Sequence, residues 1–76
     1  MSNDEAVRRA QRIVGMNIRS EREAQKITQK DLAQRCEISS VEMGLIECGE
    51  RDITVATVLH IAEQLGVSVY ILTRDT

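Results

Sequence analysis

The stretch that decides the fold is T28-Q-K-D-L-A-Q-R-C-E-I-S-S-V-E-M-G-L-I-E-C-G49. It contains two helix-start patterns, because Asp31 stands three residues after Thr28 and Glu42 stands three residues after Ser39. Both have the form of a capping box, in which the hydroxyl accepts the third helical N–H and the acid reaches back to the cap. The stretch therefore predicts two short helices that follow each other closely.

A sharp corner joins these two helices, which are expected over residues 29–36 and about 40–48. Only Cys36, Glu37 and Ile38 lie at the corner. Two short helices that meet in this way form a helix-turn-helix, whose second helix usually enters the DNA major groove. The positions expected to face inward are small or apolar, and Gly49 is the expected C-cap of the second helix. The inward set is Leu32, Ala33, Cys36, Ile38, Met43 and Ile46.

A long amphipathic helix is predicted before the motif, from Glu5 to Gln25 or Lys26, after a frayed segment over residues 1–4. Apolar residues recur there at spacings of three and four, which is the period of one helical face. Gly15 lies inside this helix, where it costs about 1 kcal/mol relative to alanine. We interpret it as a place where another helix comes close. The apolar stripe consists of Val7, Ala10, Val14 and Ile18, widened by Ile13.

Two shorter elements are predicted after the motif. Thr54 is the expected cap of a helix that ends at Gly66, in the left-handed conformation that glycine tolerates best. Ser68 is the next expected cap, before a short helix or a β-strand over residues 69–73, and residues 74–76 form a tail. The side chains expected to be buried by the helix after Thr54 are Val55, Val58, Leu59, Ala62 and Leu65, with Ile61 at the edge of that face.

The composition indicates one all-α domain over residues 1–76. The chain has no Phe, no Trp, one Tyr and no Pro, which favours an aliphatic core and uninterrupted helices. No apolar stretch approaches the roughly 18 residues of a membrane helix, and no signal peptide precedes the domain, so we expect a cytoplasmic protein with no membrane association. Cys36 and Cys48 are expected to be free, semi-buried thiols.

Catalysis and metal binding are not expected. His60 is the only histidine and is interpreted as an exposed helical residue, and the sequence has no C-x-x-C pair. No nucleophile–base pair or phosphate-binding loop is present either. The sequence therefore predicts neither an enzyme nor a cofactor.

The charge distribution is unusual for a nucleic-acid binder. The net charge is −2, but residues 1–36 carry eight Lys or Arg and five Asp or Glu, which gives +3. Residues 37–52 carry Arg51 against five acidic residues, which gives −4. The second helix of the motif and the loop after it therefore have the wrong sign for a surface that faces phosphates.

Several separate stretches carry a resemblance to a known family. They are V14-G-M-N-I-R-S-E-R22, I27-T-Q-K-D-L-A33, I38-S-S40, I46-E-C-G49 and L59-H-I-A-E-Q-L-G-V-S68. Over about residues 14–72 the chain resembles the Xre-type helix-turn-helix family, which includes the lambda-like phage repressors and Cro. The resemblance implies a five-helix, lambda-repressor-like DNA-binding domain whose second and third helices form the helix-turn-helix.

The resemblance also implies roles for individual residues. Arg22 and Glu47 match a partly buried ion pair between the first and third helices, which assigns both to structure. Gln29 matches a glutamine that meets a phosphate and supports the reading helix. The positions implied to lie at the DNA are Arg19, Thr28, Gln29, Lys30, Ser39, Ser40, Val41, Glu42, Gly44, Leu45 and Arg51.

This chain departs from the family at the base-reading positions. Readers there are usually polar, because base edges present hydrogen-bond donors and acceptors. Val41 and Leu45 offer only apolar contact, for example with a thymine methyl, and Glu42 would repel phosphates. Glu37 and Lys26 stand where glycine is common, so a positive φ at either position would add strain.

Two functions therefore compete on the sequence. The first is a sequence-specific transcriptional regulator, expected to be a repressor, that binds double-stranded DNA as a homodimer. The expected dimer interface is an exposed patch of Val69, Tyr70 and Ile71. The second is a module on the same fold that has lost DNA reading and binds a protein partner through its acidic and apolar surface.

Overall fold

The computed structural model describes residues 2–75, which form five helices and no strand. The predicted five-helix, all-α architecture is confirmed, and residues 69–73 are helical. Met1 of the expected frayed end and Thr76 of the expected tail lie outside the described residues. The helices are α1 (Ser2–Ala24), α2 (Gln29–Cys36), α3 (Ser40–Glu47), α4 (Val55–Leu65) and α5 (Val69–Thr73).

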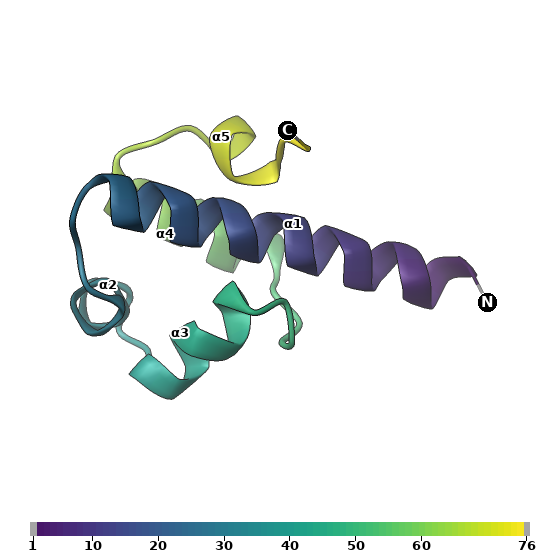
Figure 1. Ribbon diagram of the computed structural model, residues 1–76, viewed down its shortest axis with the longest axis horizontal. Coiled ribbons are helices and arrows are strands. Elements are labelled where there is room, and N and C mark those ends of the chain that lie inside the picture. The colour runs from purple at the N-terminus through teal and green to yellow at the C-terminus, as the bar shows by residue number, and fades with distance from the viewer. Residues whose placement is uncertain (1, 76) are drawn as a thin grey trace.

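Helix α1 runs along the longest dimension of the molecule, and the other helices lie around its C-terminal half (Figure 1). It packs against α3, α4 and α5, while α2 packs against α3 and α4. The N-terminal turns of α1 extend past the other helices (Figure 1), and residues 3–10 are all exposed. The principal extents of 37 × 24 × 19 Å reflect this projecting helix.

The core takes one completely buried side chain from each helix. These five side chains have relative exposures of 0% and are Ile18, Leu32, Met43, Ile61 and Leu72. Because every helix contributes, none of the five buries its apolar face without the others. A small aliphatic core of this kind stabilises a domain through many modest contacts.

The corners between helices use left-handed residues, and two of these are not glycine. Lys26 follows α1 with φ 59°, and Glu37 follows α2 with φ 62°. Gly49 and Gly66 also have positive φ, at 73° and 70°. The left-handed end expected at Gly66 is confirmed, whereas the cap of α3 is Cys48 and Gly49 follows it. The backbone therefore keeps the glycine conformation where the sequence supplies Lys and Glu.

Several expectations for α1 are wrong. The helix begins at Ser2, three residues before Glu5, and ends at Ala24. Acidic Asp4 and Glu5 lie in its first turn, where they complement the positive end of the helix dipole. Val7 is 51% exposed, and Ala10 is exposed as well, because this part of α1 projects beyond the helices that would cover it.

The predicted buried face of α4 is rotated from the observed one. Val55 and Leu59 are 75% and 49% exposed, whereas Ile61, expected at the edge, is completely buried. The observed face is Val58, Ile61, Ala62 and Leu65. Helix α4 has apolar residues on most of its faces, so their spacing alone does not predict which face is buried. Packing against α1, α2 and α5 selects that face.

Candidate nucleic-acid interface

The corner between α2 and α3 is closed by backbone hydrogen bonds. The N–H of Glu37 donates to the carbonyls of Ala33 and Gln34, and the N–H of Ile38 donates to Ala33 O at 3.0 Å. Ser39 then accepts the N–H of Glu42 on its hydroxyl at 3.0 Å, which starts α3. These bonds fix the direction in which α3 leaves α2.

A buried ion pair fixes α3 against α1. Arg22 donates from Nε to Glu47 Oε2 at 2.7 Å and from Nη2 to Glu47 Oε1 at 3.0 Å. The Glu47 side chain is 3% exposed and that of Arg22 is 11% exposed. The bonded carboxylate raises the pKa of Arg22 above its ordinary value, so the guanidinium stays charged. The geometry is the bidentate one that Arg and carboxylate favour.

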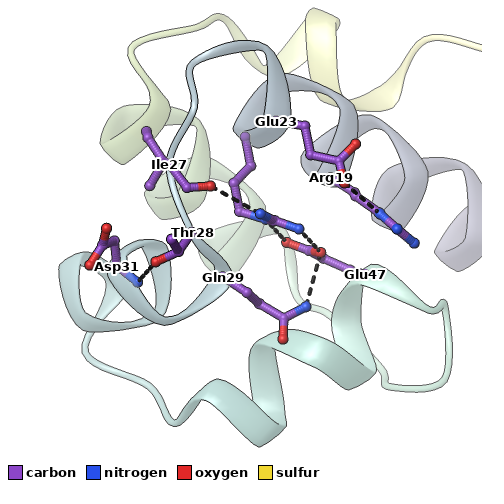
Figure 2. A network of polar contacts seen from close by, with 8 residues as sticks. Arg19, Glu23, Ile27, Thr28, Gln29, Asp31 and Glu47 are labelled. Atoms are coloured by element: carbon purple, nitrogen blue, oxygen red, sulfur yellow. Dashed lines mark hydrogen bonds and ion pairs between the residues drawn. The ribbon is translucent and has the colours of Figure 1, made fainter.

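Two further bonds extend this ion pair to the start of α2. Arg22 donates from Nη1 to the carbonyl of Ile27 at 3.0 Å. Gln29 Nε2 donates to Glu47 Oε1 at 3.1 Å, and Figure 2 shows these two side chains pointing toward each other. Glu47 is thus held by both α1 and α2. Gln29 has the supporting position that the resemblance implied, with its amide turned to Glu47.

The outward face of α3 is apolar. Val41, Leu45 and Cys48 follow each other at spacings of four and three, on the side opposite buried Met43 and Ile46. Val41 is 75% exposed, Leu45 is half-buried and Cys48 is exposed. The expectation that Cys48 is semi-buried is therefore wrong, while Cys36 is buried as expected.

The two flanks of α3 differ in chemistry. On one flank, Ser40 is exposed and Gly44 lies next to Gln29, so that a Cβ at Gly44 would stand 3.4 Å from Gln29 Oε1. On the other flank, the Glu42 carboxylate lies 3.5 Å from the guanidinium of Arg51 in the loop after α3. A candidate phosphate contact is therefore paired with an acid of α3.

The capping boxes form only in part. The Thr28 hydroxyl accepts the N–H of Asp31 and the Ser39 hydroxyl accepts that of Glu42. Within residues 2–75 neither acid returns a hydrogen bond to the N–H of its cap. The Glu42 carboxylate instead lies 3.5 Å from the guanidinium of Arg51.

The remaining candidate phosphate contacts lie on α1 and at the start of α2. Thr28 and Lys30 are exposed beside the N-terminus of α2, where backbone N–H groups favour an anion. Arg19 is exposed on α1, and its Nε lies 3.1 Å from Glu23 Oε2. Like Arg51, it is paired with a carboxylate of its own chain.

The expected dimer patch on α5 is exposed only at Tyr70. The Tyr70 side chain is 66% exposed, while Val69 and Ile71 are half-buried and pack against the core. Val69 also lines an apolar groove of about 350 Å³ between α1, α4 and α5. Exposed Val7 and Val55 stand in the wall of that groove.

Two structural residues were missed by the sequence reasoning. Asn17 Nδ2 donates to the carbonyls of Leu72 at 3.0 Å and Arg74 at 2.8 Å, which ties α5 to α1. Gln25 Nε2 donates to Leu65 O at 2.7 Å, which ties the end of α1 to the end of α4. Asn17 lies on α1 and Gln25 follows its last residue, and only the position of the partner carbonyls reveals their role.

Comparison with known families decides the class of this domain. A profile described as helix-turn-helix matches residues 18–72. The chain belongs to the Xre-type helix-turn-helix family. Its broad class is therefore that of non-enzymatic, DNA-binding regulators of transcription. A search of curated protein sequences finds no significant match.

Solved structures share the fold of this Xre-type chain. A hypothetical transcription factor, NHTF, from Neisseria has a TM-score of 0.81 at 23% identity, over 86% of this chain and 75% of that one. The clp gene regulator ClgR from Corynebacterium glutamicum has a TM-score of 0.80 at 22% identity, over 83% and 82% of the chains. The restriction-modification controller protein C.AhdI from Aeromonas hydrophila has a TM-score of 0.77 at 24% identity, over 82% and 94%. At these identities the likeness shows the fold.

Other site types find no support in the described residues. Residues 2–75 contain no cluster of three His, Cys, Asp or Glu side chains that would hold a metal ion. Within the same range, no helix combines the length and the apolar character needed to span a bilayer.

Proposed function

We propose that this Xre-type chain is a sequence-specific transcriptional repressor that binds duplex DNA as a homodimer, with α3 in the major groove. The observation that carries the proposal is the way α3 is held. Glu47 fixes its inward side through Arg22 and Gln29, while Val41 projects to solvent at 75% exposure on the opposite side. A reading helix needs this combination of a rigid support and an open face.

Phosphate contacts would position the protein on the duplex. Lys30 and the N-terminus of α2 lie on one side of α3, and Arg51 lies in the loop that follows it. Arg19 and Arg51 would exchange Glu23 and Glu42 for phosphates on binding. Because carboxylates compete for these cations, we expect modest affinity that falls steeply with salt.

A homodimer would use Tyr70 together with the groove beside Val69. The exposed ring on α5 and an adjoining apolar groove of about 350 Å³ provide a surface that a second copy would cover. A twofold dimer places two copies of α3 about one helical turn of DNA apart, so the site would be a short inverted repeat. Occupying two successive major grooves at a promoter would block other proteins, which supports repression.

The apolar outward face of α3 supports a second candidate function. Val41, Leu45 and Cys48 provide no strong donor, and Glu42 places a carboxylate beside them. Such a surface would also suit a module that binds a protein partner in place of DNA. In that case, Arg22, Gln29 and Glu47 would serve only to hold α3 in place for the partner.

Selection from random duplexes distinguishes the two functions. The full chain is incubated with the duplex pool at low salt, and the enriched site is then titrated across a salt series. The proposal predicts enrichment of an inverted repeat bound by two chains per duplex. It also predicts that the logarithm of the binding constant falls against the logarithm of the salt concentration with a slope near −5. This slope corresponds to about three phosphate contacts on each of the two subunits, at ~0.9 per contact. Failure to enrich any sequence at low salt would refute it and leave the protein-binding module.

A further inference from the structure

The outward face of α3 matches one chemical feature of base edges. We infer that Val41 and Leu45 read the C5-methyl group of pyrimidines in the major groove, so that a methylated pyrimidine is the ligand of this face. The inference rests on the proposed DNA-binding function and specifies its target. It follows from the apolar side chains of this face and from the contacts that the neighbouring polar side chains make within the protein.

The apolar character of the face is the first step. Val41 and Leu45 are one helical turn apart on the side opposite buried Met43, so both side chains present methyl groups to the same partner. Val41 is the second residue of α3, and its side chain is 75% exposed and open to a partner. At base edges in the major groove, the thymine methyl is the apolar group, and an aliphatic side chain that meets any other edge leaves donors or acceptors unpaired.

Three of the polar side chains near this face are engaged within the protein, whereas Ser40 is exposed on its flank. The Glu42 carboxylate is 3.5 Å from Arg51, and the Ser39 hydroxyl accepts the N–H of Glu42. Gln29, on the other flank, donates to Glu47. Turning the Glu42 or Gln29 side chain toward a base edge would break these contacts. Methyl readout by Val41 and Leu45 requires no such change.

The size of the face favours a base edge over a protein surface. Stable protein interfaces bury roughly 800 Å² on each partner and usually centre on aromatic or Arg anchors. Here two aliphatic side chains and one thiol form a single helical strip. The larger apolar groove lies between α1, α4 and α5 and is lined by neither Val41 nor Leu45. The narrow apolar strip of Val41, Leu45 and Cys48 is suited to contact base edges in the DNA major groove.

The same methyl group has two sources in DNA. Thymine carries it in every genome, and 5-methylcytosine carries it at the equivalent ring position. A strip that recognises the methyl alone accepts either, so the test includes separate arms for the two bases.

The test uses duplexes that differ only in this methyl group. Random pools made with thymine, with uracil in place of thymine, and with 5-methylcytosine in place of cytosine are each selected with the full chain. The enriched site is then synthesised with and without each methyl, and dissociation constants are measured. Removing a contacted methyl is expected to weaken binding about fourfold, the value of one buried methyl group.

A matched pair of variants assigns the effect to α3. Val41→Ala is expected to reduce the difference between methylated and unmethylated duplexes, because Leu45 still presents its methyl groups. Met16→Ala is expected to retain it, because Met16 is 68% exposed on α1 and lies outside both α3 and the groove proposed for the homodimer. Circular dichroism checks that both variants keep the helical fold. Retention of the full methyl effect in Val41→Ala would overturn the assignment.

The outcomes separate this inference from the proposed function. Weaker binding to the uracil duplex supports methyl reading with thymine as the source, and preference for the methylated-cytosine pool supports it with 5-methylcytosine as the source. Equal binding to all duplexes would overturn methyl reading while leaving DNA binding in place. Binding to none of the pools would overturn both, and would turn attention to a protein partner of α3.

Discussion

At the scale of single residues, the Arg22–Glu47 pair decides whether α3 stays in place. Both side chains are largely removed from water, and Glu47 also accepts a bond from Gln29. An isolated buried charge is costly, so the cost of losing one partner exceeds the net contribution of the pair itself. The pair therefore acts as a structural requirement of the reading helix.

Arg22→Ala is predicted to destabilise the domain by about 3–5 kcal/mol, because it strands the Glu47 carboxylate. Urea unfolding followed by circular dichroism measures the change. Arg19→Ala is the matched control, since Arg19 forms an exposed pair with Glu23 and should cost only about 0.3–0.5 kcal/mol. Equal stability of the two variants would exclude a structural ion pair.

Glu37→Gly is predicted to stabilise the domain by about 1 kcal/mol, because φ is 62° at this position and glycine adopts that conformation without strain. Glu50→Gly removes the same charge at a residue whose φ is not positive, and should not stabilise. Thermal unfolding of both variants provides the comparison. A lower Tm for Glu37→Gly than for the parent chain would show that the corner is not strained.

Stability should also fall at alkaline pH through Cys36. Burial raises the pKa of this thiol above its ordinary value of 9.0. Above about pH 9 the unfolded chain therefore binds fewer protons than the folded one, so the free energy of unfolding decreases as pH rises toward the folded pKa. Cys36→Ala should flatten this decrease between about pH 8 and 10. Cys48→Ser, at an exposed thiol, should retain it.

At the scale of elements, the crossing of α1 over α3 depends on Gly15. A Cβ at this position would lie 2.7 Å from the carbonyl oxygen of Glu47 and still closer to that of Ile46. Both obstacles are backbone atoms, which cannot rotate away as a side chain does. The sequence interpretation of Gly15 as a place of close approach is confirmed, and the crossing brings Glu47 within reach of Arg22.

Gly15→Ala is predicted to destabilise the domain by about 1–3 kcal/mol, despite the higher helix propensity of alanine. Gly44→Ala is the control, because its Cβ would meet only the flexible Gln29 side chain, at 3.4 Å. That variant should be neutral or slightly more stable. Denaturant midpoints for the two alanine variants give the test, and equal midpoints would mean that α1 and α3 are less closely packed than described.

How much the sequence predicts differs from element to element. The bounds of α2 and α4 follow from caps and glycines, since Thr28, Thr54 and Gly66 leave little freedom. The sequence leaves residues 69–73 open between a helix and a strand, and the structure makes them helical. The buried face of α4 could not be predicted from the sequence, because this helix has apolar residues on most of its faces. The pairing of Arg51 with Glu42 could not be predicted either, since it depends on where the loop after α3 turns.

At the scale of the whole molecule, a well-supported scaffold carries an unusual reading surface. Each of the five helices contributes one completely buried side chain to a common core. The acidic block over residues 37–52 spans α3 and the following loop, and it pairs Arg51 internally. The proposed recognition of DNA through apolar contact and a few phosphates would account for both features.

The central claim is that α3 meets base edges through its Val41 face, and selection with three proteins tests it most directly. The parent chain, Val41→Arg and Met16→Arg are each selected against the same random duplex pool. Each variant adds one positive charge at an exposed apolar residue outside the groove proposed for the homodimer, so a general gain in DNA affinity affects both. We predict that Val41→Arg alone changes the enriched sequence, with guanine appearing at the contacted position because Arg pairs with its O6 and N7. The same enriched sequence from all three proteins would contradict the claim.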